Sequence, residues 1–189
     1  MNRLIILGCG AAMGVPSLGR GWGECNPENL KNNRLRTTTY LEYNGVKLLI
    51  DTSPDLRTQL INQNIRDIDG VLYTHSHADH LHGIDDLREI NRISRQSLNF
   101  YAGRITHKAI KKRFDYLIAS VKKTNNVMQR PSLIPNVVKA NHPFYVKGVK
   151  ITPIKLKDHC PECLGYVFDD GEYVHIACLL YTSPSPRDQ

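Results

Sequence analysis

The stretch Thr74-His75-Ser76-His77-Ala78-Asp79-His80 directly follows a short apolar run. An apolar run of this length predicts a strand that is buried on both faces if it lies centrally in a sheet. Alternate residues of an extended segment face the same way, so His75 and His77 can converge on one point. Asp79 and His80 follow where we expect the chain to turn into a helix, so they point in other directions. The two pairs can therefore serve two neighbouring cations.

The residue types in this stretch indicate a catalytic metal site. Imidazole suits zinc, iron and nickel, and a carboxylate adds a hard oxygen ligand. Closed structural zinc sites favour cysteine, so imidazoles with a carboxylate predict an open site. A surface turn that is rich in histidine by chance is the alternative, and four candidate ligands within six residues argue against it. Gly83 follows where the chain must turn closely past such a site.

Strand-like and helix-like segments flank the histidine cluster on both sides. The dipeptide Asn44-Gly45 joins two β-prone runs and predicts a hairpin. The segment 106–123 predicts an amphipathic helix whose lysines lie on a solvated face rather than in a nucleic-acid site. Another helix is expected over 54–64, with Ser53 as its N-cap. Strands are expected over 3–7, 37–43, 46–51, 70–74, 99–102, 133–139, 149–156, 164–168 and 173–177, and a third helix over 85–93. This mixture predicts an α/β or α+β layered domain.

The composition is that of an ordinary globular protein of one domain. The 189 residues are 41% hydrophobic and 23% charged, which excludes collagen-like, fully disordered and membrane-embedded chains. The N-terminal apolar run is too short for a signal peptide, so we expect a cytoplasmic protein. Lys plus Arg exceed Asp plus Glu by 25 − 18 = 7, which suits an anionic partner or simply a basic surface. Five cysteines without an export signal predict free thiols or metal ligands rather than disulfides.

The last residues form a separate feature. Residues 179–189 read Leu-Leu-Tyr-Thr-Ser-Pro-Ser-Pro-Arg-Asp-Gln and continue neither a strand nor a helix pattern. The Ser-Pro-Ser-Pro unit is linker-like, and the whole string resembles translated adapter sequence. We therefore expect one partial domain over residues 1–178 and a non-native tail over residues 179–189.

These motifs resemble a known superfamily. The stretch His75 to His80 is similar to the His-x-His-x-Asp-His signature of the metallo-β-lactamase superfamily. The segments 7–16, 49–57 and 82–88 resemble one branch of it, the phosphodiesterases that act on phosphoribosyl 1,2-cyclic phosphate, which are related to tRNase Z. The resemblance spans about residues 4–177. It implies a hydrolase domain with an αββα sandwich fold, incomplete at its C-terminal end, and a dinuclear site at one edge of the sheets.

The resemblance also implies ligands for each metal ion. His75 and His77 would bind one ion together with a later histidine, for which His159 is the candidate. Asp79 and His80 would bind the second ion. Asp79 is in addition the predicted catalytic residue, because it can both ligate an ion and orient the attacking hydroxide.

The sequence departs from the superfamily pattern in two places. A bridging aspartate and a final histidine would be expected just after 173–177, and neither is recognisable, since Asp188 lies in the tail. We therefore expect this chain alone to bind its second metal ion poorly. Related phosphodiesterases have several cysteines after the Gly-Val-Pro motif, where this chain keeps only Cys25, so that structural zinc site is expected to be absent or altered. For the pair Cys160 and Cys163, a loop with free thiols is favoured over a zinc half-site or a redox pair.

Three further polar residues have two possible roles each. Asp51, at the end of a strand, could fix a ligand imidazole through a hydrogen bond, or could cap the helix that follows. Arg57 and Arg88 could recognise phosphate, because guanidinium binds it with two parallel hydrogen bonds, or could belong to ordinary helix surfaces.

The sequence favours a metal-dependent phosphodiesterase that cleaves a small cyclic ribose or nucleotide phosphate with a metal-bound hydroxide. The expected cofactors are two divalent ions, zinc before manganese or iron. The expected partner is a small phosphate ester, ahead of nucleic acid, with no membrane. The alternatives are an RNA-processing nuclease like tRNase Z, a thioester or lactone hydrolase, and a metal-binding fragment without turnover. The oligomeric state stays open, with a dimer among the options.

Overall fold

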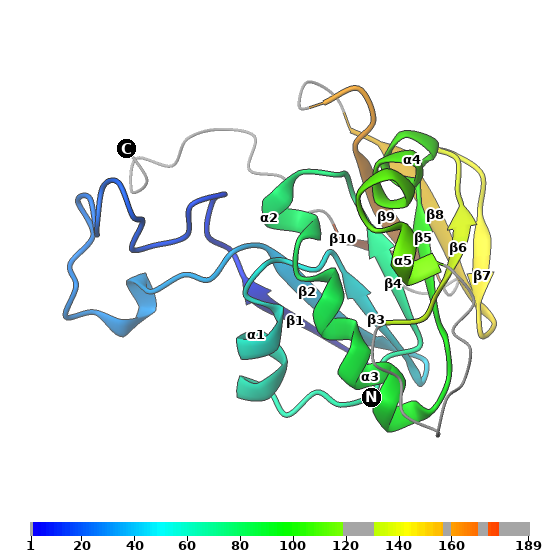
Figure 1. The fold of residues 1–189 in the computed structure, drawn as a ribbon, viewed down its shortest axis with the longest axis horizontal. Coiled ribbons are helices and arrows are strands. Elements are labelled where there is room, and N and C mark those ends of the chain that lie inside the picture. Colours follow the sequence, from blue (N-terminus) through cyan, green and yellow to red (C-terminus); the bar gives the residue numbers. More distant parts are fainter. Residues whose placement is uncertain (1, 119–130, 157–159, 170–173, 178–189) are drawn as a thin grey trace.

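The computed structural model describes residues 2–118, 131–156, 160–169 and 174–177, and it contains two sheets and several short helices (Figure 1). The larger sheet contains, in spatial order, β1 (Arg3–Gly8), β2 (Thr38–Tyr43), β3 (Val46–Ile50), β4 (Gly70–Tyr73), β5 (Leu98–Ala102) and β6 (Leu133–Val137). The smaller sheet contains β10 (Val174–Ala177), β9 (Leu164–Asp169), β8 (Val149–Lys155) and β7 (Phe144–Val146). The helices are α1 (Leu56–Asn62), α2 (Ala78–Leu81), α3 (Leu87–Ser94), α4 (Arg104–Arg113) and α5 (Asp115–Ile118), with 3-10 turns η1 (Leu30–Asn32) and η2 (Ile84–Asp86). No helix in the described part of the chain has the length and apolar content that a membrane crossing requires.

The larger sheet changes from antiparallel to parallel across its width. β1, β2 and β3 pair antiparallel, and the predicted hairpin is confirmed, since Asn44 (φ 50°) and Gly45 (φ 76°) both adopt the left-handed conformation. From β3 to β6 the pairing is parallel. Ile50 lies beside Leu72, so the residues that follow β3 and β4 are neighbours at one edge. In sheets with parallel strands, ligands bind outside this carboxyl edge.

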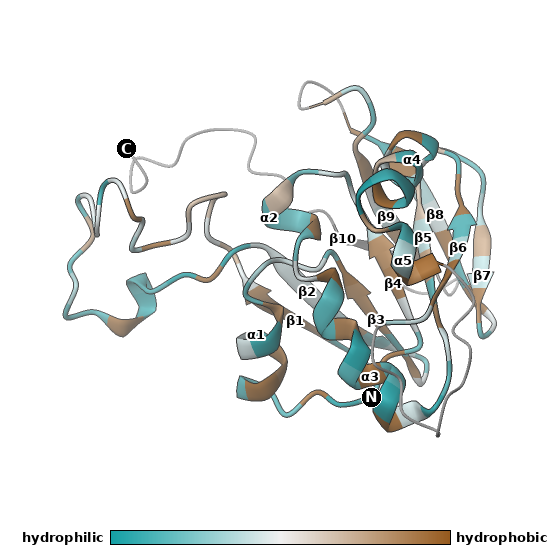
Figure 2. Ribbon diagram, viewed as in Figure 1, coloured by the Kyte–Doolittle hydropathy of each residue, from teal (hydrophilic) through white to brown (hydrophobic). Residues whose placement is uncertain are grey.

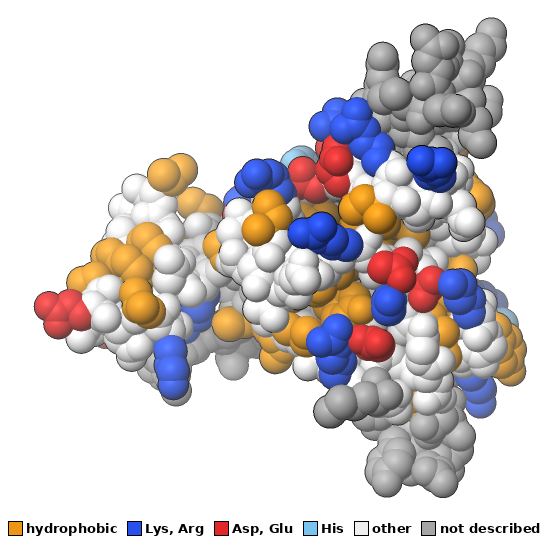
Figure 3. Space-filling view, turned by 90° about the horizontal axis from the view of Figure 1, so that it is seen from below, with side chains coloured by type: hydrophobic (Ala, Val, Ile, Leu, Met, Phe, Trp, Pro, Cys, Tyr) orange, Lys and Arg blue, Asp and Glu red, His pale blue; other side chains and the backbone are white. Residues whose placement is uncertain are grey.

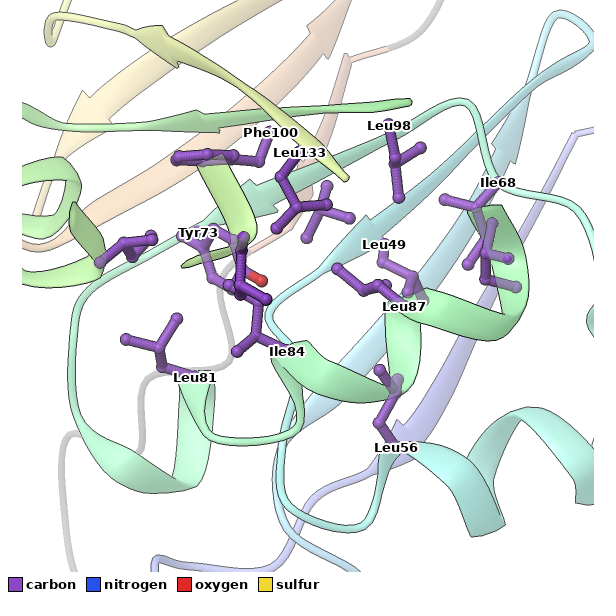
Figure 4. Packing of buried hydrophobic residues seen from close by; sticks show 14 of the residues in the cluster. Leu49, Leu56, Ile68, Tyr73, Leu81, Ile84, Leu87, Leu98, Phe100 and Leu133 are labelled. Carbon is purple, nitrogen blue, oxygen red and sulfur yellow. The ribbon is translucent and has the colours of Figure 1, made fainter. Parts of the chain in front are cut away.

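Alternation along the strands gives the larger sheet two apolar faces. Leu49 and Tyr73 face the helices, and Figure 4 shows their side chains in that core. The helix residues in the same core include Leu56, Leu60, Leu81, Leu87, Ile90, Ile110 and Leu117. Ile50 and Leu72 belong to the second core, between the two sheets. The smaller sheet contributes Val149, Ile151, Leu164, Tyr166 and Phe168 to it. The described residues therefore form successive layers of helices, sheet and sheet, with apolar strands inside (Figure 2), and the predicted fold class is confirmed.

Two predicted helices are wrong in their bounds. The helix expected over 106–123 begins at Arg104 and ends at Arg113, because Phe114 leaves the helical conformation (φ −136°) before the short helix α5. Residues 119–123 lie outside the described residues. The helix expected over 54–64 is α1, and its N-cap position is occupied by Asp55 rather than Ser53. The strand β7, only three residues long, was not expected from the sequence.

A long loop, residues 11–35, projects from the body of the molecule (Figure 1). At its base, Val15 and Arg34 exchange two backbone hydrogen bonds of 3.0 and 2.9 Å. Met13, Leu18 and Leu30 are exposed on this loop, and Figure 3 shows a group of hydrophobic side chains there. The Cys25 sulfur accepts a hydrogen bond of 3.5 Å from the Arg34 guanidinium.

Candidate metal centre

The histidine cluster lies at the carboxyl edge of the larger sheet, in the connection from β4 to α2. β4 ends at Tyr73, and α2 begins at Ala78 with His77 in extended conformation before it. The His80 carbonyl accepts a hydrogen bond of 2.8 Å from the Thr52 backbone N–H, just beyond β3. The segments that follow β3 and β4 are thus joined at this edge.

Three imidazoles converge in this connection. The ring centroid of His75, which is fully buried, lies 4.5 Å from that of His77 and 4.2 Å from that of His80. His80 is also buried, whereas His77 is exposed. The cluster therefore has a closed inner end and an open outer end, which is the arrangement that a site with access for a small molecule needs.

Asp79 adds a carboxylate to the cluster. Its Oδ2 lies 3.3 Å from His80 Nε2, and its side chain is 16% exposed. Burial raises the pKa of Asp79, but the contact with His80 outweighs burial and holds the pKa below its usual range. The carboxylate is therefore ionised at neutral pH.

Asp51 accepts three hydrogen bonds beneath the cluster. Its carboxylate accepts from the Thr74 backbone N–H (2.8 Å), from the Thr74 hydroxyl (2.7 Å) and from His80 Nδ1 (2.7 Å), and its side chain is 1% exposed. Carboxylate oxygens accept hydrogen bonds, so His80 Nδ1 donates to Asp51 and carries a proton, while His80 Nε2 lies 3.3 Å from Asp79 Oδ2. Burial lowers the pKa of His80, but the Asp51 charge and hydrogen bond outweigh it and raise the pKa to about 10. Asp51 has a left-handed backbone (φ 64°), which asparagine and aspartate tolerate better than most residues.

Thr74 extends this arrangement to a second imidazole. Because its hydroxyl hydrogen is donated to Asp51, its oxygen accepts from His75 Nδ1, 2.9 Å away. His75 Nδ1 therefore also carries a proton, so Nε2 is the ring nitrogen through which His75 would bind a metal ion. One buried carboxylate thus orients two imidazoles, one directly and one through a hydroxyl. Sequence reasoning missed Thr74, because its role depends on the contact of its hydroxyl with Asp51.

The types of donor group in the cluster fit a transition-metal ion, although the side chains do not surround an ion in this arrangement. No three His, Cys, Asp or Glu side chains in the described ranges are arranged to hold a metal ion as they stand. Three imidazoles and a carboxylate nevertheless converge, and Asp51 and Thr74 bind the Nδ1 atoms of His80 and His75. This chemistry suits zinc, iron or manganese. His159 lies outside the described residues.

Neighbouring elements hold the connection in place. The guanidinium of Arg113, at the end of α4, donates a hydrogen bond of 2.7 Å to the Ser76 carbonyl between the first two histidines. The Cys163 thiol is buried, 3.9 Å from His75 Nδ1. No disulfide joins the cysteines that the structure describes.

The two candidate phosphate-binding arginines lie elsewhere. Arg57 and Arg88 line a cavity of about 460 Å³ between α1 and α3, together with Leu60, Ile90 and Ile93. None of the four clustered site residues lines this cavity. The structure therefore brings Asp51 to the histidines and does not bring Arg57 or Arg88 to them.

Gly83 is required by a close backbone approach beside the cluster. A Cβ atom at this position would lie 1.9 Å from the Ser53 carbonyl oxygen, and the Gly83 N–H donates to the Thr52 carbonyl (2.9 Å). Because both contacts are with backbone, Gly83→Ala is expected to lower the free energy of unfolding by about 3 kcal/mol. Urea denaturation measures this difference.

Gly19 offers a matched control for that substitution. Nothing lies within 4 Å of a Cβ built on Gly19, in the projecting loop. Gly19→Ala should therefore leave the urea midpoint unchanged or slightly raised. An equal midpoint for Gly83→Ala and the parent would show that the close approach does not constrain the fold.

The chain matches a family of known proteins over most of its length. Residues 47–179 match the β-lactamase superfamily domain. An octanoyltransferase from Porphyromonas gingivalis is 34% identical over 165 residues, 87% of this chain and 32% of that protein. A ribonuclease Z from Clostridioides difficile is 27% identical over 175 residues, 89% of this chain and 50% of that protein. The chain thus spans a third to a half of the length of these curated relatives.

A solved structure shows the same likeness in three dimensions. A diphosphatase from the PhnP family is 31% identical, with a TM-score of 0.75, over 89% of this chain and 63% of that chain. Human tRNase Z, short form, matches at 17% identity with a TM-score of 0.60 and shows a shared fold. The family match over residues 47–179, the two-sheet fold and the His-x-His-x-Asp-His stretch agree, and the chain belongs to the metallo-β-lactamase superfamily, a superfamily of hydrolases.

Proposed function

We propose that this chain is part of a metal-dependent hydrolase that cleaves phosphodiesters, with a small cyclic ribose or nucleotide phosphate as substrate. The observation that carries the proposal is the convergence of His75, His77, Asp79 and His80 above the Asp51 carboxylate. The relatives support a phosphorus-centred reaction, because a diphosphatase and a ribonuclease Z are among them.

The proposed ligands divide between two ions. His75 and His77, with His159, would hold one ion, and Asp79 with His80 would hold the other. Two divalent ions, zinc before manganese or iron, would lower the pKa of water and stabilise negative charge on the phosphoryl oxygens.

The chain's own residues prepare this site in three ways. Asp51 and Thr74 accept hydrogen bonds from Nδ1 of His80 and His75, so that each ring would bind a metal ion through Nε2. Asp79, ionised and only partly exposed, can accept a proton or hydrogen bond from the attacking water. Arg113 fixes the backbone between His75 and His77.

Hydrolysis of bis(4-nitrophenyl) phosphate tests the proposal. The chain should release 4-nitrophenolate when zinc or manganese is supplied, and a chelator should stop the release. Addition of the metal to the chelated protein should restore it. Turnover that persists in the chelator would contradict metal dependence, and zinc binding without any turnover would support the metal-binding fragment instead.

RNA processing is the second candidate, because one of the curated relatives described above is a ribonuclease Z. The helix α4, whose Arg113 contacts Ser76 in the cluster, also carries three exposed lysines, Lys108, Lys111 and Lys112. An RNA substrate would contact many phosphates, so its binding would weaken steeply as salt rises, whereas a small ester would show a shallow dependence. Cleavage of a tRNA precursor in preference to the small ester would favour this candidate.

A further inference from the structure

A second cavity lies beside the loop that precedes β9. Its volume is about 430 Å³, within the range of sites for small molecules. It is lined by the first turn of α4, by the segment that follows β6, by the end of β8 and by the loop before β9, which is orange beside α4 in Figure 1. We refer to it as the basic pocket, after its three cations Arg104, Lys139 and Lys155.

The positive charge of the basic pocket is not neutralised within the described residues. Arg104, Lys139 and Lys155 are exposed, and their charged side chains make no hydrogen bond or ion pair with another described residue. The one carboxylate in the lining, Glu162, accepts hydrogen bonds from the backbone N–H groups of Ile105 (2.7 Å) and Thr106 (3.2 Å) at the start of α4. Its charge therefore interacts first with the positive end of that helix.

The Glu162 carboxylate lies directly against the backbone of Gly103. A Cβ on Gly103 would lie 2.3 Å from the carboxyl atoms of Glu162, so a larger residue at position 103 would force the carboxylate to move. Because Glu162 closes the N-terminus of α4, an incoming anion meets the three side-chain cations rather than the helix end.

The rest of the lining is apolar. Val138 and Leu164 are buried in the wall, and Ile105 and Val137 are about half exposed around it. A cavity with apolar walls and a few convergent charges suits a ligand that has one apolar part and one anionic group. Guanidinium and ammonium groups together favour phosphate, which Arg can bind with two hydrogen bonds and Lys as a point charge.

The basic pocket shares one loop with the histidine cluster. Glu162 and Leu164 line the pocket, and the residue between them, Cys163, lies 3.9 Å from His75. The Leu164 N–H donates a hydrogen bond of 3.0 Å to the Thr74 carbonyl. A ligand in the pocket would thus contact residues adjoining those that orient His75.

We propose that the basic pocket binds the phosphate group of a small organic phosphate. The group belongs either to the far end of a substrate held at the histidine cluster or to a separate ligand. The proposal does not depend on hydrolysis, because binding can be measured on the protein with metal removed.

Calorimetric titration of the chelated full chain with phenyl phosphate tests the pocket, with phenol and inorganic phosphate as probes of each half of the ligand. Phenyl phosphate should bind, more tightly than either half alone. Arg104→Ala and Lys139→Ala should each weaken binding about fivefold, the effect of about 1 kcal/mol from one charge near the surface. Lys111→Ala, which removes an exposed cation of α4 outside the pocket, should leave the affinity unchanged.

Two results would overturn the proposal. One is no binding of phenyl phosphate by the parent chain, and the other is equal weakening by Lys111→Ala, which would indicate general attraction to a basic surface. A kinetic comparison shows whether the bound phosphate belongs to the substrate or to a separate ligand. The metal-loaded chain is assayed on a cyclic nucleotide with and without a 5′-phosphate. A raised KM in Arg104→Ala for the 5′-phosphorylated form alone assigns the pocket to the substrate, and equal KM values with phenyl phosphate still bound assign it to a separate ligand.

Discussion

His77→Ala is expected to lower metal-dependent hydrolysis of bis(4-nitrophenyl) phosphate by more than about 100-fold, because it removes a proposed metal ligand rather than a residue that only orients one. His77 is exposed at the outer end of the cluster, so its side chain contributes little to the buried core. The far-ultraviolet circular dichroism spectrum and the urea midpoint should therefore stay close to those of the parent. Loss of turnover in a folded variant is the expected combination.

His142 provides the matched control for this substitution. It is also an exposed histidine, and its Nδ1 hydrogen-bonds the Ala140 carbonyl in the turn before β7. His142→Ala should keep both zinc binding and turnover. Undiminished hydrolysis by the His77→Ala variant would refute the assignment of His77 to the metal centre.

Asp51→Asn should have the second largest effect. The amide keeps the size of the carboxylate, and asparagine tolerates the left-handed backbone (φ 64°), so the substitution changes the hydrogen bonds and not the shape. One of its two polar ends becomes an N–H₂ donor that must face the donors of Thr74 or His80. We expect a 10- to 100-fold loss of zinc affinity, on the order found for groups that orient metal ligands. The free energy of unfolding should fall by about 1–3 kcal/mol, because a buried donor loses its partner.

Substitution of Thr74 distinguishes the effect of Asp51 on His75 from its effect on His80. Thr74→Val removes the hydroxyl that lies between Asp51 and His75, whereas Thr74→Ser keeps it. Titration calorimetry with zinc should show weakened binding for the valine variant and near-parent binding for the serine variant. If the Asp51→Asn variant and the Thr74→Val variant each bound zinc as tightly as the parent, the buried carboxylate would not be needed to orient the metal ligands.

Local signals in the sequence predict most of the larger sheet. Asn44-Gly45 requires left-handed backbone at both positions, and the hairpin between β2 and β3 has it. The apolar run before the histidines is β4, buried in the centre of the sheet. These features depend on a few neighbouring residues, so periodicity and turn chemistry suffice.

Features that depend on tertiary packing were not predictable from local patterns. Apolar residues keep a helical spacing through Phe114, so the break between α4 and α5 leaves no mark in that pattern. The strand β7 is too short for a periodicity, although Lys147 and Gly148 form its tight turn to β8. The sequence also allowed two roles for Asp51, a hydrogen bond to a ligand imidazole or a helix cap. In the fold Asp51 lies 2.7 Å from His80 Nδ1, and Asp55 occupies the N-cap position of α1.

The candidate site was predictable where its residues are close in sequence. The spacing of His75, His77, Asp79 and His80 indicated convergence at a strand end, and the structure places their side chains together. The role of Thr74 could not be read from spacing, because it depends on which group its hydroxyl meets across the sheet.

Zinc-edge X-ray absorption of the zinc-loaded chain tests the central claim most directly. Ligation by His75, His77, Asp79 and His80 predicts only nitrogen and oxygen neighbours, at about 2.0–2.2 Å, with the outer-shell scattering that imidazole rings produce. The same signal should be lost in part when His77 is replaced by alanine. A spectrum dominated by sulfur at about 2.3 Å would place the metal on cysteines such as Cys160 and Cys163 and would contradict the account.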